Sequence, residues 1–324
     1  MTPTAADGRS AAGRLCVISP MHNEGSHAER VVAGMRAQRR APDLWVIVDD
    51  QSTDDTLERV RAAAKGLDYA RVLAFERPPI TTNDRLAHAL EAESFNHGLR
   101  AAGGPDSFDY IAKLDGDVVL PPDYYETCIA HLERNPQVGI VCGQLRETIA
   151  GAPRILPIAG RHVHGALKMY RRECFLAIGG MREQLGWDAI DEIYARMKGF
   201  TTVSLPAPIG DHLRPVGSSD GILRGRARHG VVAYMTHFPW YWVIGRSMKL
   251  ACARPRVLSG FAFLWGYARA SLNATERVDD PAFRAFARKE LRLRTVSFLT
   301  SAASRLVGRR PAAVASAEVR QAEA

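Results

Sequence analysis

The apolar positions along the chain form two alternating patterns. Short runs of consecutive apolar residues, which are typical of strands buried on both faces, recur through the first half of the sequence. They cover residues 15–19, 44–48, 71–75, 110–114 and 138–142. Between these runs apolar residues recur at helical spacing, which predicts helices over 26–38 and 123–134 and through Val60 and Phe95. Strands that alternate with helices predict an α/β fold with a mostly parallel sheet covered on both faces.

Acidic side chains follow several of the predicted strands. Pro20-Met-His-Asn-Glu24 follows the first strand, Asp49 and Asp50 follow the second, and Asp115 and Asp117 follow the strand at 110–114. Because ligands of open α/β sheets bind at the carboxyl ends of the strands, these groups are expected at one edge. A turn at Gly116 would let both neighbouring carboxylates face one site, where a divalent cation would offset their repulsion. An ordinary surface turn is the alternative.

A second group of acids lies at the start of a predicted helix that ends near Gly199-Phe200. Asp188, Asp191 and Glu192 stand at positions i, i+3 and i+4 and so share one helix face. Trp187 is an apolar neighbour able to raise a carboxylate pKa toward that of a general base. The alternative is that the acids only stabilise the positive end of the helix.

The composition, with 46% hydrophobic and 24% charged residues, is that of a globular protein. Five scattered cysteines without a Cys-x-x-Cys pair favour reduced thiols in the cytosol and argue against a zinc site. The first thirteen residues have no apolar core, so they predict a loose tail and not a signal peptide. The sequence also contains neither Gly-x-Gly-x-x-Gly nor a P-loop, so it supports no dinucleotide cradle.

The two parts of the chain on either side of residue 220 differ in net charge. Residues 1–220 carry 25 Lys and Arg against 29 Asp and Glu, whereas residues 221–324 carry 18 against 6. The aromatic stretches 231–244 and 257–267 are shorter than the roughly 20 apolar residues that span a bilayer. Their flanking arginines favour an anionic membrane surface over nucleic acid, for which no motif is present. A helical subdomain packed on the sheet is the alternative.

The predicted organisation therefore has four parts. They are a disordered tail (1–13), an α/β domain (14–220), a basic helical extension that associates with membranes (221–310) and a second disordered tail (311–324). Within the extension, residues 281–310 are predicted to form a basic amphipathic helix or a pair of helices.

Four of these segments, in this order, resemble glycosyltransferase family 2, whose members have the GT-A fold. The similarity covers roughly residues 14–215. It is carried by Val17-Ile-Ser-Pro-Met-His-Asn-Glu24, Val48-Asp-Asp-Gln-Ser-Thr-Asp-Asp-Thr56, Leu114-Asp-Gly-Asp-Val-Val119 and the Trp187-Asp188 helix. The resemblance implies an inverting sugar transfer from a nucleotide-diphosphate sugar with Mg²⁺ or Mn²⁺.

The resemblance also implies roles for single residues. The base and ribose of the donor would be held by Pro20, Glu24, Asp49 and Asp50. Asp115 would approach the ribose or the sugar. Asp117 would bind the metal, and His212 would complete its site, although a lone histidine is more often structural.

The catalytic base is the point at which the chain departs from the family pattern. Where the family usually shows Gly-Glu-Asp, this chain has Gly186-Trp-Asp188, so Asp188 is the expected base. Asp191 or Glu192, one turn further on, could take over a second acidic role, and Asp191 is the second candidate for the base. Arg214 and Arg226 could clamp the diphosphate, or could be surface charges.

The sequence thus predicts a non-processive glycosyltransferase, since the Gln-x-x-Arg-Trp signature of processive synthases is missing. It would act at the cytoplasmic face of the plasma membrane on a lipid-linked or saccharide acceptor, in bacterial polysaccharide or glycoconjugate synthesis. One alternative is a sugar-nucleotide pyrophosphorylase, although the Gly-x-Gly-x-Arg-Leu start of that family is absent. The other is a non-catalytic nucleotide-sugar-binding or membrane-scaffold protein.

Overall fold

The computed structural model describes residues 13–78, 85–149, 151–156, 158, 161–214 and 221–306. The predicted tails, apart from Gly13, lie outside the described residues. The chain divides into two compact units, residues 1–214 and 215–324. The boundary follows directly after the last strand of the sheet, and each unit is described by itself.

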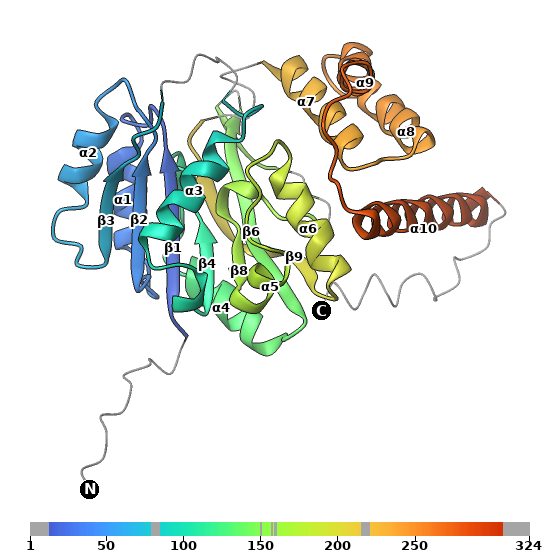
Figure 1. The fold of residues 1–324 in the computed structure, drawn as a ribbon. Helices are drawn as coiled ribbons and strands as arrows, with labels where there is room; N and C mark the ends of the chain where they lie inside the picture. The colour runs from blue at the N-terminus through green and yellow to red at the C-terminus, as the bar shows by residue number, and fades with distance from the viewer. Residues whose placement is uncertain are drawn as a thin grey trace, which may run out of the picture. The chain divides into compact units, whose positions relative to one another are not determined.

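The amino-terminal unit is built on one mixed sheet (Figure 1). Its parallel half contains β3 (Ala70–Ala74), β2 (Leu44–Asp49), β1 (Leu15–Met21) and β4 (Tyr110–Lys113), in that order. The sheet continues through β8 (Met169–Arg171), β6 (Val138–Ile149), β9 (Thr201–His212) and β5 (Val118–Val119). β7 (Ala152–Ile155) pairs only with β6.

The α/β fold class is confirmed, and the predicted parallel pairing holds for β3, β2, β1 and β4. The short strand β8 then enters antiparallel to both β4 and β6, which makes the other half mixed. β6 is also longer than predicted, because it continues from Cys142 to Ile149 and pairs with β9 over most of that length. This extension carries the sheet to the residues around His212.

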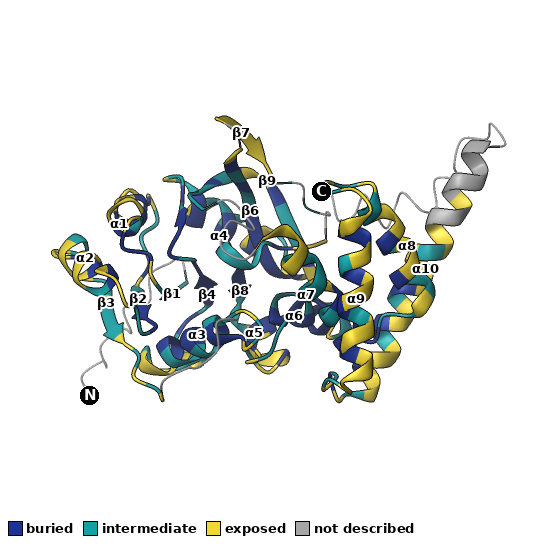
Figure 2. Cartoon of the chain, turned by 90° about the horizontal axis from the view of Figure 1, so that it is seen from above, coloured by how far each residue is buried: buried dark blue, intermediate teal, exposed yellow. Residues whose placement is uncertain are grey.

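Helices cover both faces of the sheet (Figure 2). On one face lie α1 (Ala28–Arg36) and α4 (Tyr124–Arg134), and on the other α3 (Leu90–Ala101), α5 (Arg172–Ala177) and α6 (Trp187–Met197). α2 (Thr56–Ala63) follows β2, and two short 3₁₀ helices, η1 (Pro105–Ser107) and η2 (Gly165–Leu167), complete the unit.

The strands form where predicted because their side chains are apolar on both faces. Val17, Ile18, Val46 and Ile47 are fully buried, as β-branched residues between two helical layers should be. α3 lies so close to the sheet that a Cβ at Gly98 would be 2.7 Å from Val48 Cγ2. Close packing of this kind holds the carboxyl ends of the strands, and the loops that follow them, in place.

The carboxyl-terminal unit is helical. It contains α7 (Ile222–Met235), α8 (Trp240–Ala251), α9 (Leu258–Leu272) and α10 (Pro281–Leu306). α7 and α9 pack backbone to backbone, since a Cβ at Gly230 or Gly266 would meet main-chain atoms of the other helix about 2 Å away. Among the described residues, no helix combines the length and the apolar character needed to cross a membrane.

Candidate active site

The loops after β1 and β2 are joined at the carboxyl edge of the sheet. The two strands pair up to Met21 and Asp49, and the Asp50 amide then donates to the Met21 carbonyl at 2.7 Å. His22 Nδ1 lies 2.8 Å from the Asp50 carbonyl oxygen. Glu24 is buried and its amide donates to Thr56 Oγ1 at 2.8 Å. The residues predicted to hold the nucleoside therefore lie on one connected edge.

Asp49 and Asp50 have different surroundings, although both are buried. The Asp50 carboxylate forms ion pairs with Arg77 and Arg85, and the Arg77 side chain also pairs with Glu93 at 2.6 Å. Asp49 Oδ1 has no hydrogen-bond partner in the described part of the chain. Asp49 thus retains an unused acceptor, whereas Asp50 is occupied by two guanidinium groups.

The turn between Asp115 and Asp117 is pressed against the loop that follows β1. A Cβ at Gly116 would lie 2.9 Å from both Glu24 Cγ and Met21 Cγ, so any larger residue there would displace these side chains. The two carboxylates take different partners: Asp115 forms an ion pair with Lys113, and Asp117 contacts His212. The turn at Gly116 therefore lets the two neighbouring carboxylates contact different partners.

His212 is held between two carboxylates. Its Nε2 lies 3.4 Å from Asp117 Oδ2, and its Nδ1 lies 2.7 Å from Glu147 Oε1. The register of β6, β9 and β5 sets this arrangement, because Glu147 and Val118 are both partners of His212. Burial disfavours the imidazolium, but the hydrogen bonds and charges of Asp117 and Glu147 outweigh it and raise the pKa of His212 to about 9.

Asp117 and His212 would bind a divalent cation only together with ligands from phosphate and water. No three His, Cys, Asp or Glu side chains converge on a metal position within the described ranges. Asp117 and His212 supply two adjacent donor groups, and Glu147 on Nδ1 would fix the tautomer that presents Nε2. Mg²⁺ commonly binds one or two protein groups and takes its other ligands from phosphate and water. The donor set therefore suits a cation that arrives with a diphosphate.

Glu24 and Arg214 add a second charged pair beside Asp117. Arg214 donates to Glu24 Oε2 at 2.6 Å and to the Asn23 carbonyl at 3.3 Å. Burial and the nearby charge of Asp117 raise the pKa of Glu24 to about 8. Arg214 is thus held at the same edge as Asp117.

The acids of α6 separate into one accessible group and two enclosed groups. Asp188 is half-buried in the first turn, after Gly186, which adopts a left-handed φ of 81°. Asp191 is buried against Lys168 Nζ, at 3.1 and 3.2 Å, and accepts a hydrogen bond from the Tyr170 hydroxyl. Burial raises the pKa of Asp191 to about 7. Glu192 accepts from the Val163 amide at 2.9 Å, so both enclosed acids serve internal partners.

Two buried lysines lie between the acids that follow β4 and the acids of α6. Lys113 is the last residue of β4, and Lys168 directly precedes β8, which pairs with β4. The Lys113 amide donates to the Lys168 carbonyl at 2.8 Å. Both side chains are fully buried, and each Nζ lies 5.3 Å from the centroid of the Trp187 ring. Lys113 pairs with Asp115, and Lys168 Nζ donates to the Asp188 carbonyl at 2.8 Å. The lysine that pairs with Asp115 and the lysine that contacts the Asp188 carbonyl therefore both lie near the Trp187 ring.

Sequence reasoning missed Lys113, Lys168 and Glu147. The lysines could have been found, since each is a single charge within an apolar segment, Tyr110-Ile-Ala-Lys-Leu114 and Leu167-Lys-Met-Tyr170. Nothing in the local sequence singles out Glu147. Arg226 lies on α7 in the carboxyl-terminal unit, so its predicted contact with a diphosphate stays a prediction.

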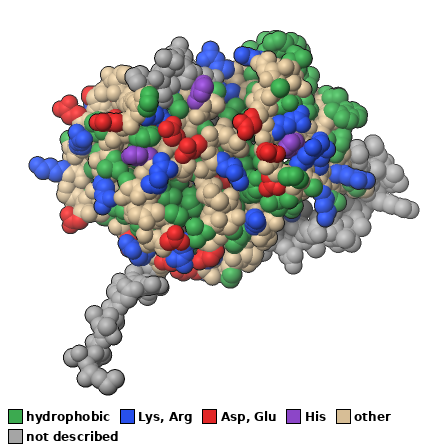
Figure 3. Space-filling model, viewed as in Figure 1, with side chains coloured by type: hydrophobic (Ala, Val, Ile, Leu, Met, Phe, Trp, Pro, Cys, Tyr) green, Lys and Arg blue, Asp and Glu red, His purple; other side chains and the backbone are tan. Residues whose placement is uncertain are grey.

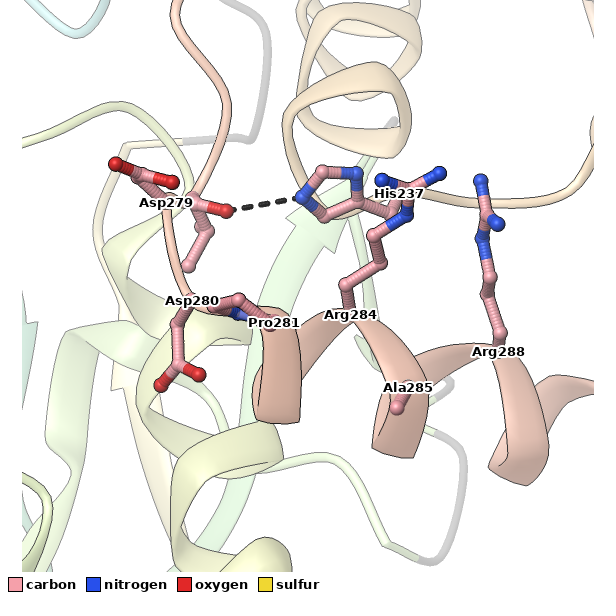
Figure 4. Close-up of a pocket in the computed structure, with 8 residues that line it drawn as sticks. His237, Asp279, Asp280, Pro281, Arg284, Ala285 and Arg288 are labelled. Carbon is pink, nitrogen blue, oxygen red and sulfur yellow. Dashed lines mark hydrogen bonds between the residues drawn. The ribbon is translucent and has the colours of Figure 1, made fainter.

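A pocket of about 310 Å³ lies in the carboxyl-terminal unit (Figure 4). It is lined by His237, Val278, Asp279, Asp280, Pro281, Arg284, Ala285 and Arg288. Its polar groups support the backbone: His237 Nε2 donates to the Val278 carbonyl at 2.9 Å, and Asp280 Oδ1 accepts from the Ala282 and Phe283 amides at the start of α10. Burial and nearby arginines lower the pKa of His237. Because the polar groups of this pocket already bind the backbone, we place the candidate active site at the sheet edge and not in the pocket.

Comparison with known proteins identifies the family of the amino-terminal unit. Residues 16–175 match the family model described as Glycosyl transferase family 2. Residues 16–175 are a glycosyl transferase family 2 domain. A curated relative, the poly-beta-1,6-N-acetyl-D-glucosamine synthase of Staphylococcus aureus, is 24% identical over 125 residues. That alignment covers 39% of this chain and only 27% of the relative.

Solved structures show the same fold. A mannosyltransferase from Pyrobaculum calidifontis, in complex with GDP-Man and Mn²⁺, has a TM-score of 0.51 at 20% identity. The alignment covers 92% of this chain and 84% of that one. GalNAc-T7 with UDP, GalNAc and Mn²⁺ has a TM-score of 0.52 at 13% identity, over 84% of this chain and 61% of that one. The chain has the GT-A fold, as the family resemblance implied.

Proposed function

We propose that the protein is an inverting glycosyltransferase that moves a sugar from a nucleotide-diphosphate sugar to an acceptor hydroxyl. The observation that carries the proposal is the contact path from Asp50 through Met21 and Gly116 to Asp115, and from Asp115 through Lys113 to Trp187. This path connects acidic residues of four distant segments, three of which lie within the residues that match family 2. The carboxyl edge of the sheet is where an α/β fold binds and converts its ligand.

The donor would lie across the loops after β1, β2 and β4. Pro20, Glu24, Asp49 and Asp50 would contact the nucleoside, and Asp115 the ribose or sugar. Asp49 Oδ1, which has no hydrogen-bond partner among the described residues, would accept from an N–H or O–H group of the nucleoside. Asp50 would instead act by fixing Arg77 and Arg85 beneath the base. Arg214 would contact the diphosphate oxygens.

We further propose that Asp117 and His212 hold Mg²⁺ or Mn²⁺ together with the diphosphate. Bound there, the cation would neutralise the charge that develops on the departing diphosphate. Two contacts within the chain support this site: Glu147 would keep the His212 ring oriented, and Arg214 pairs with Glu24.

Asp188 is our candidate for the general base. Its carboxylate would take the proton of the acceptor hydroxyl while that oxygen bonds to the anomeric carbon and the bond from this carbon to the diphosphate breaks. The nucleoside diphosphate leaves, and no covalent intermediate with the enzyme is needed. We assign this role to Asp188 and not to Asp191, because Asp191 is enclosed by Lys168 and Tyr170 and cannot reach a substrate.

The acceptor we propose is lipid-linked, in non-processive synthesis of a bacterial surface polysaccharide or glycoconjugate. The protein would then work at the cytoplasmic side of the plasma membrane as a peripheral protein. Support comes from the basic carboxyl-terminal third, with 18 Lys and Arg against 6 Asp and Glu, and from the curated relative, a polysaccharide synthase.

The test is turnover of a panel of nucleotide sugars with Mn²⁺, with Mg²⁺ and with a chelator. We expect release of nucleoside diphosphate from one class of donor, loss of this release with the chelator, and inversion at the anomeric carbon by NMR. Binding of a nucleotide sugar without any turnover, with acceptor lipids supplied, would instead support a non-catalytic binding protein.

A further inference from the structure

The carboxyl-terminal unit exposes an unusual number of large apolar side chains. Of the seventeen large hydrophobic residues that are exposed in the described part of the chain, nine lie between Trp240 and Leu272. They are Trp240, Ile244, Met248, Val257, Leu258, Phe261, Leu264, Trp265 and Leu272. Single exposed apolar residues are normal, but a group of them on two helices that pack together indicates an interaction surface. We call these nine residues the apolar face.

The apolar face follows from how the helices pack. On α8, Trp240, Ile244 and Met248 recur every four residues and so form one stripe. The other side of α9 is used internally, because Gly266 meets α7 and the Gly260 carbonyl accepts from Ser247 Oγ at 3.0 Å. The opposite side of α9 is exposed (Figure 2). It carries the large apolar side chains of Leu258, Phe261, Leu264, Trp265 and Leu272.

The charged residues within the segment that carries the apolar face are all of one sign. Residues 240–272 contain five basic residues and no acidic residue. Lys249, Arg254, Arg256 and Arg269 are exposed, and Arg246 is half-buried over the Phe263 ring. Hydrophobic and basic side chains gather over these helices in Figure 3. A partner for this surface must therefore offer negative charge together with an apolar interior.

We propose that the apolar face binds the surface of an anionic phospholipid bilayer, with α8 and α9 lying in the headgroup region. Trp240, Phe261 and Trp265 are of the type that prefers this boundary, and the basic residues would contact phosphate headgroups. No described helix can cross the bilayer, so the contact is superficial. A second copy of the chain is disfavoured, since a symmetric contact would bring like charges together.

A lipid-linked acceptor would approach the protein from the side of the apolar face, and only this statement about the acceptor rests on the proposed glycosyl transfer. Binding of the bilayer itself does not depend on catalysis. It is therefore tested without substrate, so that a failure of one proposal is distinguishable from a failure of the other.

The experiment is sedimentation of the full chain with phosphatidylcholine vesicles, with and without phosphatidylglycerol. We expect binding that requires phosphatidylglycerol and weakens with added salt. The triple variant Trp240→Ser, Phe261→Ser, Trp265→Ser should bind at least about tenfold more weakly, because insertion scales with apolar area. The matched control is Ile155→Ser with Leu176→Ser, two exposed apolar positions of the other unit, which should bind like the wild type.

Tryptophan fluorescence gives a second readout. Brominated lipids should quench the emission of the wild type mainly through the exposed Trp240 and Trp265, because Trp45 and Trp187 are buried and Trp242 is half-buried. The variant Trp240→Phe, Trp265→Phe keeps aromatic area, so it should still bind but lose most of the quenching. An unchanged melting temperature shows that each variant is folded.

Three results would overturn the proposal. One is a wild type that does not bind anionic vesicles. Another is a triple serine variant that binds as tightly as the wild type. The third is a wild-type dimer in analytical ultracentrifugation that becomes monomeric in the triple variant while neither binds vesicles, since the apolar face would then join two copies of the chain.

Discussion

Replacing Lys168 with methionine tests the link between the buried charges and the candidate base. The substitution keeps most of the side-chain volume but removes an ammonium that contacts the Asp188 carbonyl and the Asp191 carboxylate. Removing one partner of a buried ion pair costs about 3–5 kcal/mol. Asp191 keeps the Tyr170 hydroxyl and Glu192 keeps the Val163 amide. We therefore expect a loss near the lower limit, about 3 kcal/mol at pH 8.

The loss should depend on pH. In the wild type the pKa of Asp191 is about 7 when folded, above its ordinary value of 3.8. The native state therefore binds more protons than the unfolded state between these values, so stability falls as the pH rises through this window. Without the ammonium the folded pKa of Asp191 rises further, and the fall continues above pH 7. Each pKa unit is worth about 1.4 kcal/mol, so the variant should lose about 1 kcal/mol more at pH 8 than at pH 6.

The assay is urea unfolding followed by circular dichroism at both pH values. Lys198→Met is the matched control, since Lys198 is exposed at the end of the same helix and should change stability by less than about 0.5 kcal/mol. A Lys168→Met loss below about 1 kcal/mol at both pH values, or one that does not change with pH, would refute the reasoning.

Three further predictions concern the sheet edge. Asp188→Asn should lower the rate of sugar transfer about 10²–10⁴-fold with nucleotide affinity unchanged; equal rates in steady-state kinetics, beside the exposed control Asp106→Asn, would exclude Asp188 as the base. Glu147→Gln removes the charge behind His212, so calorimetry should show about 10–100-fold weaker Mn²⁺-dependent binding of nucleoside diphosphate; unchanged affinity would speak against the metal position. The folded pKa of His212 is about 9, above its ordinary 6.5, so its contribution to stability is complete below pH 6.5 and lost as the pH rises through 9. Thermal melting of the metal-free protein should show this decline, and His212→Gln should lack it.

The sequence alone was enough for the parallel strands, for the helices between them and for the edge at which they were predicted to present acids. Runs such as Trp45–Val48 are apolar on both faces, and the polar residues begin where each strand ends. Hydrophobic periodicity and strand direction are local properties, so they can be read without knowing any distant contact. The family resemblance supplied the expected roles of Asp117 and Asp188, and these roles stay proposals.

Only the tertiary structure decided how the charges are paired. Arg77 occupies Asp50, Lys168 encloses Asp191, and Glu147 orients His212 across the pairing of β6 with β9. Each partner is distant in sequence, and its distance is set by sheet register and helix packing. Whether a buried charge is stable depends on the group within about 4 Å of it. That neighbour is determined by the fold as a whole, which is why no local pattern could show it.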